Sequence, residues 1–256
     1  EAVLDVGCGT GAMLHEARAG GHRGRLCGLD PAPAMLAQAC KRTDIEWVLG
    51  DLASVAFDGE FDLIVMTGHA FQVLIEDRDL QGALAAVRKA LTPDGRFAFE
   101  TRNPGVRAWE EWRPERVLTF AEPSGAKVQM RRDVVAPFDG RTVSFTHTFS
   151  SPGWAKSKVS QSTLRFLDAP SLNALLTEAG LVIDEQYGNW DRRPLSGAGR
   201  RARPCTARGR WRPTTLRKWA SRDSRGWTWA TSAAPASRSA WAARSMLSGL
   251  APRALS

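Results

Sequence analysis

The sequence predicts an α/β fold: a doubly wound, mostly parallel sheet with helices on both faces and an antiparallel β insertion. Three observations lead to this fold class. Short apolar runs alternate with segments of helical periodicity in the first part of the chain, a pattern typical of parallel strands joined by helices. The first apolar run ends in a loop with glycine at alternate positions. After the fifth run, single polar and apolar residues alternate, as in a half-buried antiparallel strand.

The first strand and its loop occupy the stretch Val3–Gly11. An apolar run that contains Asp5 leads into three glycines at every second position. Glycine has no Cβ atom and tolerates positive φ, so such a loop lets a ligand touch the backbone directly. A helix expected from Ala12 directs its unpaired N–H groups and positive dipole end at that ligand. The loop therefore predicts a nucleotide-like cofactor.

Four further apolar runs are predicted to form the other parallel strands. The run Leu26–Asp30 ends in a carboxylate 19 residues after Gly11, about the distance at which an acid contacts both ribose hydroxyls of a bound nucleotide. Asp30 is also placed to cap a helix that begins at Pro33, and both roles are compatible. The remaining strands are expected at Ile45–Asp51, Phe61–Met66 and Arg96–Glu100.

Helices are predicted where apolar residues recur on one helical face. The segment Leu80–Leu91 has this spacing and is expected to end in the turn Thr92–Gly95 before the fifth strand. A second helix is expected over Leu172–Ala179, with Gly180 as its C-terminal stop. The apolar run Leu181–Ile183 follows and predicts another strand.

Residues 102–167 interrupt the alternation of strands and helices. The stretch Thr142–Phe149 alternates polar and apolar residues with a period of two, which indicates a half-buried antiparallel strand. Runs at Val117–Ala121, Lys127–Val135 and Ser157–Leu167 can pair with it. Such an insertion stands beyond the carboxyl ends of the parallel strands, where open α/β sheets bind ligands, and we expect it to be a substrate lid.

The glycine spacing selects among cofactors. In a dinucleotide fingerprint the third glycine comes one residue later than it does here. The loop instead resembles, at every position, the S-adenosylmethionine-binding loop of class I methyltransferases, and the resemblance covers the front three quarters of the chain. It implies a Rossmann-like fold with strand order 3-2-1-4-5-7-6, S-adenosyl-L-methionine as cofactor, and methyl transfer to a small-molecule acceptor by in-line attack on the sulfonium methyl.

The same resemblance implies which residues contact the cofactor. It places Asp51 near the adenine amino group and Leu52 against the adenine ring, although Asp51 in a loop can equally be a solvated acid. The full set of expected cofactor contacts is Asp5, Gly7, Cys8, Gly9, Gly11, Asp30, Pro31, Met35, Asp51, Leu52 and Thr67.

His69 is the candidate catalytic residue. It follows the fourth strand in the loop that faces the methyl group in members of the family, and histidine titrates near neutral pH. It is therefore expected to take a proton from an amine or hydroxyl of the acceptor. The alternative is that His69 only packs against the cofactor. His147 lies among apolar residues and is expected to be a core histidine with its hydrogen bonds satisfied.

Candidate substrate residues come after the fifth strand. Arg102 and Asn103 are placed to orient the acceptor, together with Glu100. Trp109 and Trp112 form either an aromatic wall of the acceptor site or part of the core of the insertion, and the sequence leaves both interpretations open.

Residues 196–256 differ in composition from the rest. The chain has a formal charge of +8, yet this tail holds thirteen Lys and Arg residues and one acid, while the front part is mildly acidic. The tail has no Val, Ile or Phe, which predicts disorder or short isolated helices and leaves the last antiparallel strand of the sheet without a candidate. One hypothesis is a basic arm that binds nucleic acid weakly and without sequence preference. The favoured one is a tail translated out of frame after about Ser196.

The expected domains are a methyltransferase domain at residues 1–195, with its lid at 102–167, and a basic tail at 196–256. The first strand begins almost at once, so the N-terminal helical segment usual in the family is expected to be missing. No apolar run approaches the ~20 residues of a membrane span, and four cysteines without C-x-x-C spacing suggest a cytoplasmic protein with no metal site.

Other functions remain open at this stage. An inactive relative that only binds the cofactor, a nucleotide-dependent oxidoreductase, and a nucleic-acid methyltransferase that uses the basic tail are the alternatives. The acceptor atom and the oligomeric state cannot be inferred from the residues.

Overall fold

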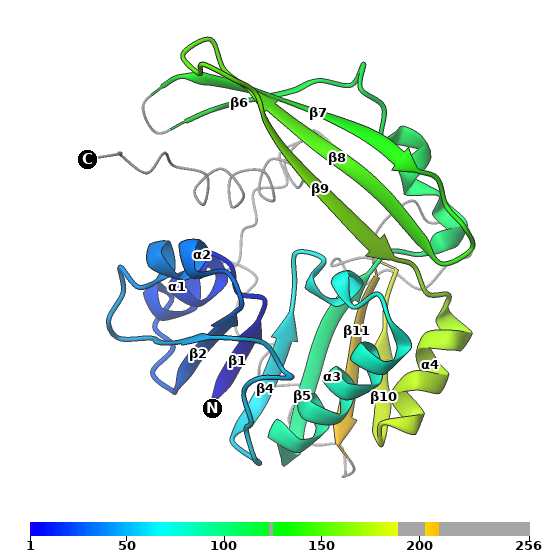
Figure 1. The fold of residues 1–256 in the computed structure, drawn as a ribbon. Helices are drawn as coiled ribbons and strands as arrows, with labels where there is room; N and C mark the ends of the chain where they lie inside the picture. The colour runs from blue at the N-terminus through cyan, green and yellow to red at the C-terminus, as the bar shows by residue number, and fades with distance from the viewer. Residues whose placement is uncertain (123–124, 189–202, 210–256) are drawn as a thin grey trace.

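The computed structural model describes residues 1–122, 125–188 and 203–209 and contains two sheets, which Figure 1 shows one above the other. The main sheet has the strand order β10-β11-β5-β4-β1-β2-β3, and β1 to β5 pair in parallel. This confirms the predicted parallel sheet. Its strands are β1 (Val3–Val6), β2 (Leu26–Asp30), β3 (Glu46–Leu49), β4 (Phe61–Met66), β5 (Leu91–Thr101), β10 (Leu181–Gln186) and β11 (Arg203–Gly209).

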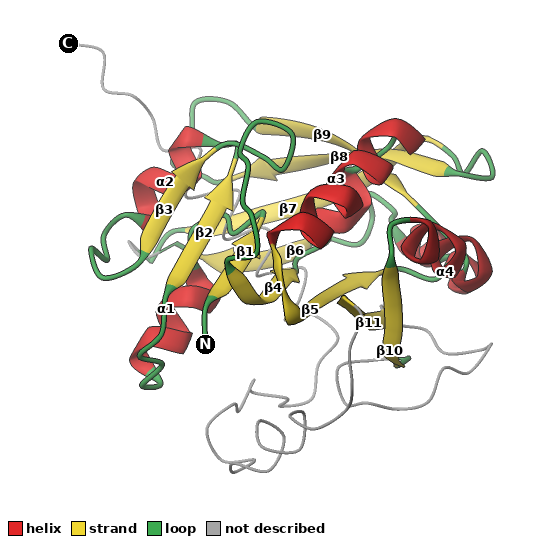
Figure 2. Cartoon of the chain, turned by 90° about the horizontal axis from the view of Figure 1, so that it is seen from below, coloured by secondary structure: helices red, strands yellow, loops and turns green. Residues whose placement is uncertain are grey.

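Helices cover both faces of the main sheet (Figure 2). On one face, Leu14 packs against Val3, and Trp47 of β3 contacts both this cluster and the one formed by the next helix. On the other face, Leu4 packs in the cluster that contains the apolar side chains of the two later helices. Successive residues of a strand point to opposite faces, which accounts for this division. The helices are α1 (Ala12–Ala19), α2 (Pro33–Ala39), α3 (Asp77–Ala90) and α4 (Ala169–Glu178).

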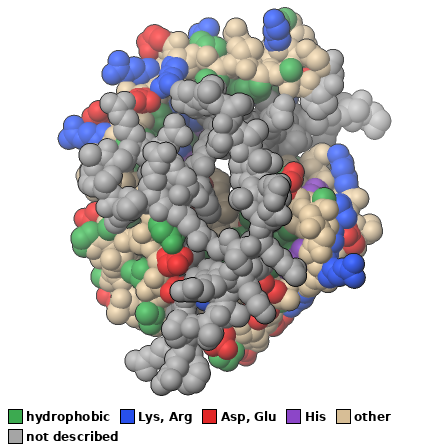
Figure 3. Space-filling model, turned by 180° about the vertical axis from the view of Figure 1, so that it is seen from behind, with side chains coloured by type: hydrophobic (Ala, Val, Ile, Leu, Met, Phe, Trp, Pro, Cys, Tyr) green, Lys and Arg blue, Asp and Glu red, His purple; other side chains and the backbone are tan. Residues whose placement is uncertain are grey.

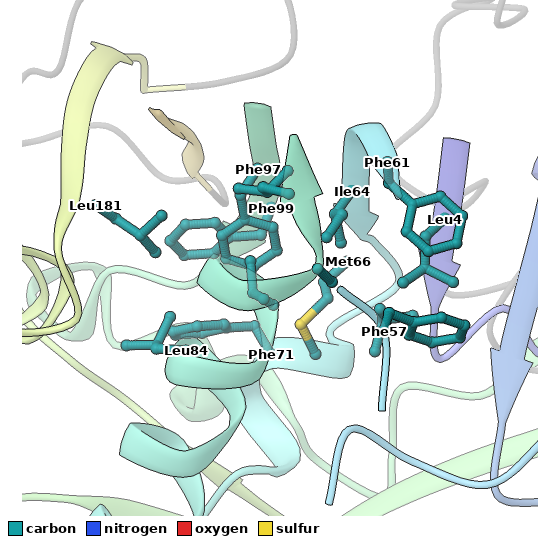
Figure 4. Packing of buried hydrophobic residues seen from close by; sticks show 14 of the residues in the cluster. Leu4, Phe57, Phe61, Ile64, Met66, Phe71, Leu84, Phe97, Phe99 and Leu181 are labelled. Carbon is teal, nitrogen blue, oxygen red and sulfur yellow. The ribbon is translucent and has the colours of Figure 1, made fainter. Parts of the chain in front are cut away.

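The main core lies between the sheet and helices α3 and α4 (Figure 4). The rings of Phe97 and Phe99 stack with centroids 4.7 Å apart, and Phe71 stacks on Phe99 at 4.3 Å. Burying each such side chain contributes about 1.5–3 kcal/mol. The cluster therefore fixes β4 and β5, the strands that carry several of the predicted site residues at their ends.

The second sheet, here called the lid sheet, is antiparallel with the order β6-β7-β8-β9. It confirms the predicted antiparallel insertion, and β8 has the predicted alternation, with Val143, Phe145, His147 and Phe149 buried. Whether it acts as a substrate lid stays a prediction. Its strands are β6 (Leu118–Ala121), β7 (Lys127–Ala136), β8 (Thr142–Ser150) and β9 (Lys158–Arg165).

Two arginines attach the lid sheet to the segment that precedes α3, an arrangement here called the latch. Arg165, at the end of β9, donates to the carbonyl oxygen of Ile75 at 3.0 Å and forms an ion pair with Asp77. Arg141 donates to the same carbonyl at 2.8 Å and lies 3.3 Å from the Asp77 carboxylate. Mainly through its hydrogen bond with Arg165, this contact lowers the pKa of Asp77. The lid sheet is thus tied to the main sheet at one end.

The prediction that the last antiparallel strand is missing is wrong. Strand β11 lies in the tail, where disorder or isolated helices were expected, and pairs antiparallel with both β5 and β10. The resulting order matches 3-2-1-4-5-7-6. The error has a physical reason: the open position between two strands offers unpaired N–H and C=O groups, and satisfying them outweighs weak β propensity, even with Pro204 in the strand. The rest of the tail, 196–202 and 210–256, lies outside the described residues. The predicted change of reading frame after about Ser196 therefore also falls outside them.

Most other element predictions agree with the structure. Helices α3 and α4 form at the expected segments, and Gly180 follows α4 with φ 73°. Several boundaries shift by one to three residues, and the largest difference is that β5 begins at Leu91 rather than Arg96. Phe61 pairs with Leu91 and Leu63 with Arg96, so the expected turn becomes an irregularity inside the strand.

The described surface carries charges of both signs. On the face seen in Figure 3, Lys and Arg side chains gather toward the upper rim and along one edge, with Asp and Glu side chains beside them. Over the described ranges, none of the helices combines the length and the apolar character that crossing a bilayer requires.

Candidate functional site

The predicted site residues come from the carboxyl ends of neighbouring strands in the main sheet. The glycine loop follows β1, and its Gly7 N–H donates to the carbonyl of Leu29 in β2 at 2.8 Å. A Cβ atom on Gly7 would lie 2.7 Å from the Cβ of Ala70, so the loop touches the short 3-10 helix Ala70–Val73 that follows β4. The structure therefore brings the glycine loop next to Ala70, the residue that follows His69.

Glycine is required at Gly9 and Gly11 for different structural reasons. Gly9 has φ 57°, and a Cβ atom there would meet nothing within 4 Å, so its backbone faces open space. Gly11 has φ 73°, and a Cβ atom there would lie 2.2 Å from the Trp47 ring. The same ring excludes a side chain at Gly28 in β2. Trp47 therefore packs beneath the loop, and Gly9 remains as the position where the loop exposes its backbone.

Asp30 joins the end of β2 to the glycine loop. Its Oδ2 accepts from the Gly9 N–H at 2.8 Å, and its Oδ1 accepts from the Ala32 N–H at the start of α2 at 2.8 Å. One hydrogen bond of the carboxylate thus goes to the glycine loop and the other to the start of α2. An ionised carboxylate offers about four acceptor positions, so two bonds leave capacity for a ligand hydroxyl.

Asp5 is the second carboxylate at this edge. The residue is 2% exposed, and its Oδ1 has no hydrogen-bond partner among the described residues. Burial, and secondarily the charge of Asp30, raise the pKa of Asp5 to about 7. A buried acceptor without a partner is costly, and a donor supplied by a ligand would remove that cost.

The other expected cofactor contacts lie around this centre. Asp51 is exposed, and its Oδ1 accepts from the N–H of Ala53 at 3.0 Å and from the N–H of Ser54 at 2.9 Å. These bonds hold a local turn and lower the pKa of Asp51, chiefly through the Ser54 side chain. The solvated-acid alternative therefore remains open. Cys8 is buried, Leu52, Met35 and Thr67 are partly exposed, and Pro31 is exposed.

His69 is held between two charged residues. Its Nε2 lies 2.6 Å from Nη2 of Arg102, and its Nδ1 lies 3.8 Å from Oε1 of Glu100. A guanidinium can only donate, so Nε2 of His69 must accept and the ring carries its proton on Nδ1. Glu100 also accepts from the Gly68 N–H at 3.0 Å. The lone pair that a catalytic base needs is therefore engaged by Arg102.

Arg102 and Trp112 lie together, with a third residue from the lid sheet. The guanidinium carbons of Arg102 and Arg132 lie 5.3 and 5.0 Å from the Trp112 ring centroid. Burial lowers the pKa of Arg102 to about 9, with a smaller contribution from Arg132, and Glu100 opposes the shift. Both arginines remain charged at neutral pH.

The other two substrate candidates have structural roles in the described residues. Asn103 accepts from the Gly105 N–H at 3.0 Å and caps the short helix Pro104–Val106. Trp109 stacks on Phe138 with centroids 4.4 Å apart and packs edge-on against Phe166 at 4.7 Å. Trp109 therefore belongs to the core of the insertion, whereas Trp112 contacts both this core and the arginines.

Sequence reasoning missed two residues of this cluster, Arg132 and Gln72. Arg132 lies on β7 at the same parity as the buried Val128 and Met130, and a charged residue on an apolar strand face was an available signal. Gln72 is 1% exposed and links Arg102 to the carbonyl of Arg165, and no sequence pattern marks it. In the described part of the chain, His, Cys, Asp and Glu form no group of three that could hold a metal ion.

The chain is similar in sequence to known methyltransferases. Residues 3–95 match a family described as "Methyltransferase domain". The chain is 34% identical over 116 residues to a 2-phytyl-1,4-naphtoquinone methyltransferase of Thermosynechococcus vestitus, covering 43% of this chain and 50% of that protein. It is 30% identical over 103 residues to a cypemycin N-terminal methyltransferase of a Streptomyces species, covering 40% of this chain and 42% of that protein. The chain thus spans half or less of the length of these curated relatives.

Solved structures of methyltransferases have the same fold. An S-adenosylmethionine-dependent methyltransferase of Clostridium acetobutylicum superposes with a TM-score of 0.67 at 15% identity, covering 81% of this chain and 83% of that one. CalS10, an amino pentose methyltransferase of Micromonospora echinaspora solved with S-adenosylmethionine bound, superposes with a TM-score of 0.59 at 24% identity. The superposition covers 80% of this chain and 82% of CalS10. With its strand order and its glycine loop, the chain has the class I methyltransferase fold, and residues 3–95 match the methyltransferase-domain family.

Proposed function

We propose that this protein binds S-adenosyl-L-methionine at the glycine loop and transfers its methyl group to a small-molecule acceptor. The observation that carries the proposal is the loop itself. Gly9 presents bare backbone to open space and donates its N–H to Asp30, and the nearby buried Asp5 has an oxygen without a partner among the described residues. The methyltransferase-domain match covers the same residues.

The residues present fit the cofactor. S-adenosylmethionine carries two ribose hydroxyls and an ammonium group, all of which donate hydrogen bonds to acceptors such as Asp30 and Asp5. When bound, it supplies a methyl group already activated by the positive charge on sulfur. The protein's contribution is then to orient the acceptor and to exclude water.

Proton removal by His69 depends on Arg102. Because Arg102 donates to Nε2, His69 becomes a base only when that hydrogen bond is released. Glu100, 3.8 Å from Nδ1, is placed to stabilise the ring once it takes up a proton. We therefore assign Arg102 the role of holding His69 neutral until the acceptor is bound.

The comparisons support methyl transfer but leave the acceptor atom open. The two relatives named above are a 2-phytyl-1,4-naphtoquinone methyltransferase and a cypemycin N-terminal methyltransferase, and a third similar protein is a malonyl-[acyl-carrier protein] O-methyltransferase. Cys8 and Cys27 are buried and free, which supports a reducing compartment such as the cytoplasm.

The cofactor site is tested by a pair of glycine substitutions. Gly9→Val places a branched side chain where the backbone must meet the ligand, and it should abolish binding of S-adenosylhomocysteine in isothermal titration. Gly59→Val is the matched control, because Gly59 has φ 64° against 57° for Gly9 and equally open space. The control carries the same backbone strain away from the site and should keep its affinity within about twofold. No binding to the wild type, or equal binding by both variants, would contradict the proposal.

A second experiment distinguishes an active methyltransferase from a protein that only binds the cofactor. A screen of small-molecule amines, hydroxyls and activated carbons, read out as release of S-adenosylhomocysteine, should find turnover that Gly9→Val abolishes. A wild type that binds S-adenosylhomocysteine and turns over no acceptor would identify a binding-only relative.

A further inference from the structure

Two arginines of the cluster around Trp112 carry charges that no carboxylate balances directly. Within residues 1–122, 125–188 and 203–209, neither Arg102 nor Arg132 forms an ion pair. Other arginines that are at least partly buried behave differently: Arg96 lies 3.6 Å from Asp184, and Arg165 pairs with Asp77. The two unpaired arginines therefore stand out.

Neutral groups hold both guanidiniums in place. Arg102 donates to Nε2 of His69 at 2.6 Å and to Oε1 of Gln72 at 3.3 Å, and Arg132 donates through Nε to Nε2 of His147 at 2.8 Å. An imidazole nitrogen that accepts a hydrogen bond carries no proton. Burial, and then the charge of Arg132, lower the pKa of His147 to about 3, so this histidine stays neutral. The hydrogen bonds orient the arginines without cancelling their charge.

Glu100, the carboxylate whose charge acts on the pKa of Arg102, has other contacts. Its Oε1 accepts from the Gly68 N–H at 3.0 Å and lies 3.8 Å from Nδ1 of His69. Its charge raises the pKa of Arg102 without offsetting the effect of burial. The single negative charge of Glu100 against the two positive charges of Arg102 and Arg132 leaves the cluster with a net positive charge.

The cluster lies between the carboxyl end of β5 and the lid sheet. Arg102 follows the carboxyl end of β5, next to the loop of His69, whereas Arg132 and His147 belong to the lid sheet. Both arginines are partly exposed, and removing such charges from water without an opposite charge is costly. The planar guanidinium matches the geometry of carboxylate and phosphate oxygens.

We propose that Arg102 and Arg132 bind an oxyanion, a carboxylate or phosphate group carried by the methyl acceptor. The inference rests on the proposed function and specifies its substrate class. Binding of the anion draws Arg102 toward the ligand and releases Nε2 of His69, so that recognition of the acceptor and freeing of the base occur together.

The test compares two adjacent arginines of β7 in the full chain. Arg132→Gln removes a charge from the cluster, and Arg131→Gln removes the same charge from the opposite, exposed face of the strand. Benzoate, inorganic phosphate and diphosphate are titrated by calorimetry at constant ionic strength, with S-adenosylhomocysteine as a separate titrant. Benzoate reports a carboxylate site and the two inorganic anions a phosphate site.

The wild type should bind at least one anion saturably. Arg132→Gln should weaken that binding about tenfold or more, the loss expected for a charge-assisted hydrogen bond, while Arg131→Gln should change it less than about twofold. S-adenosylhomocysteine affinity should be unchanged in both variants. If Arg132→Gln fails to melt cooperatively, Arg132→Lys, which keeps the charge and loses the planar fork, serves for the comparison.

Absence of saturable binding of all three anions, or equal weakening by both substitutions, overturns the inference. Its failure is distinguishable from failure of the proposed function. A chain that binds S-adenosylhomocysteine but no anion loses only this inference, and a chain that binds no S-adenosylhomocysteine loses the proposed function.

Discussion

At the scale of single residues, strands β1 and β2 each bring a carboxyl group to the glycine loop, and the charge of one acts on the other. Asp30 has two backbone donors, whereas Oδ1 of the buried Asp5 has none among the described residues. Burial, more than the neighbouring charge, raises the pKa of Asp5 to about 7. The charged form of Asp5 is therefore disfavoured in the folded protein, and a cationic ligand would stabilise it.

This shift in pKa predicts a pH dependence of stability. The pKa of Asp5 rises from 3.8, the value for an unburied aspartate, to about 7 on folding. Between these values the folded state holds a proton that the unfolded state has lost, so this group makes stability fall as pH rises. We expect a contribution of about 2–4 kcal/mol over the window, which Asp5→Asn should remove. Urea denaturation between pH 4 and 8 measures it, with the exposed Asp94→Asn as control, and parallel curves for wild type and Asp5→Asn would refute it.

At the scale of elements, the latch decides how the lid sheet is held. Arg141 and Arg165 both reach the Ile75 carbonyl and Asp77, so the β7–β8 hairpin and the end of β9 meet the chain at one point. Gln72 binds the carbonyl of Arg165 at 2.9 Å and Arg102 at 3.3 Å. The attachment point of the lid is therefore connected to the arginine cluster.

Breaking the latch should loosen the lid sheet before the rest of the protein. Arg165→Met keeps most of the apolar stem but removes the hydrogen bond to the Ile75 carbonyl, an expected loss of about 1.5–3 kcal/mol, together with the ion pair to the exposed Asp77. Hydrogen exchange should accelerate over β6 to β9 more than over β1 to β5. Arg78→Met, which removes a 3.4 Å surface ion pair with Asp79 from a side chain 90% exposed, is the control and should change neither region. Uniform acceleration across both sheets would contradict a separate latch.

Elements with strong local patterns could be predicted, and those set by distant pairing could not. The run into Gly7–Gly11 and the carboxylate ends of β1 and β2 are local signals, so the loop and Asp30 were predicted. Strand β11 was missed because pairing with β5 and β10 on its two sides stabilises it more than the β propensity of its own residues does. The contact of Arg132 with Trp112 depends on a strand of the lid folding back over the chain, which no local pattern encodes.

At the scale of the whole molecule, β11 completes the main sheet. It is the only link between β5 and β10 in the described sheet order, since β10 pairs with no other described strand. Without it, one side of β5 has unpaired backbone groups, and α4 and β10 are held by side-chain contacts, which include the 3.6 Å ion pair between Arg96 and Asp184.

Shortening the chain tests this role. A chain ending at residue 188 should melt at a lower temperature than one ending at residue 209 and should aggregate through the open edge of β5. Scanning calorimetry and light scattering measure the two effects. Equal melting temperatures for the two shortened chains would show that β11 contributes nothing to stability.

The position of β11 also has a consequence for biosynthesis. Ala207 pairs with Phe97, so β5 leaves the ribosome long before the strand that covers it. During that interval β1 to β4 and the glycine loop can assemble, while β10 emerges before its neighbour exists. Pairing between distant segments is slow and leaves strand edges open to wrong partners. A ligand that binds the early-formed loop stabilises the half-built sheet by mass action. We therefore expect the yield of folded protein in the cell to rise with the supply of the cofactor, before any reaction is catalysed.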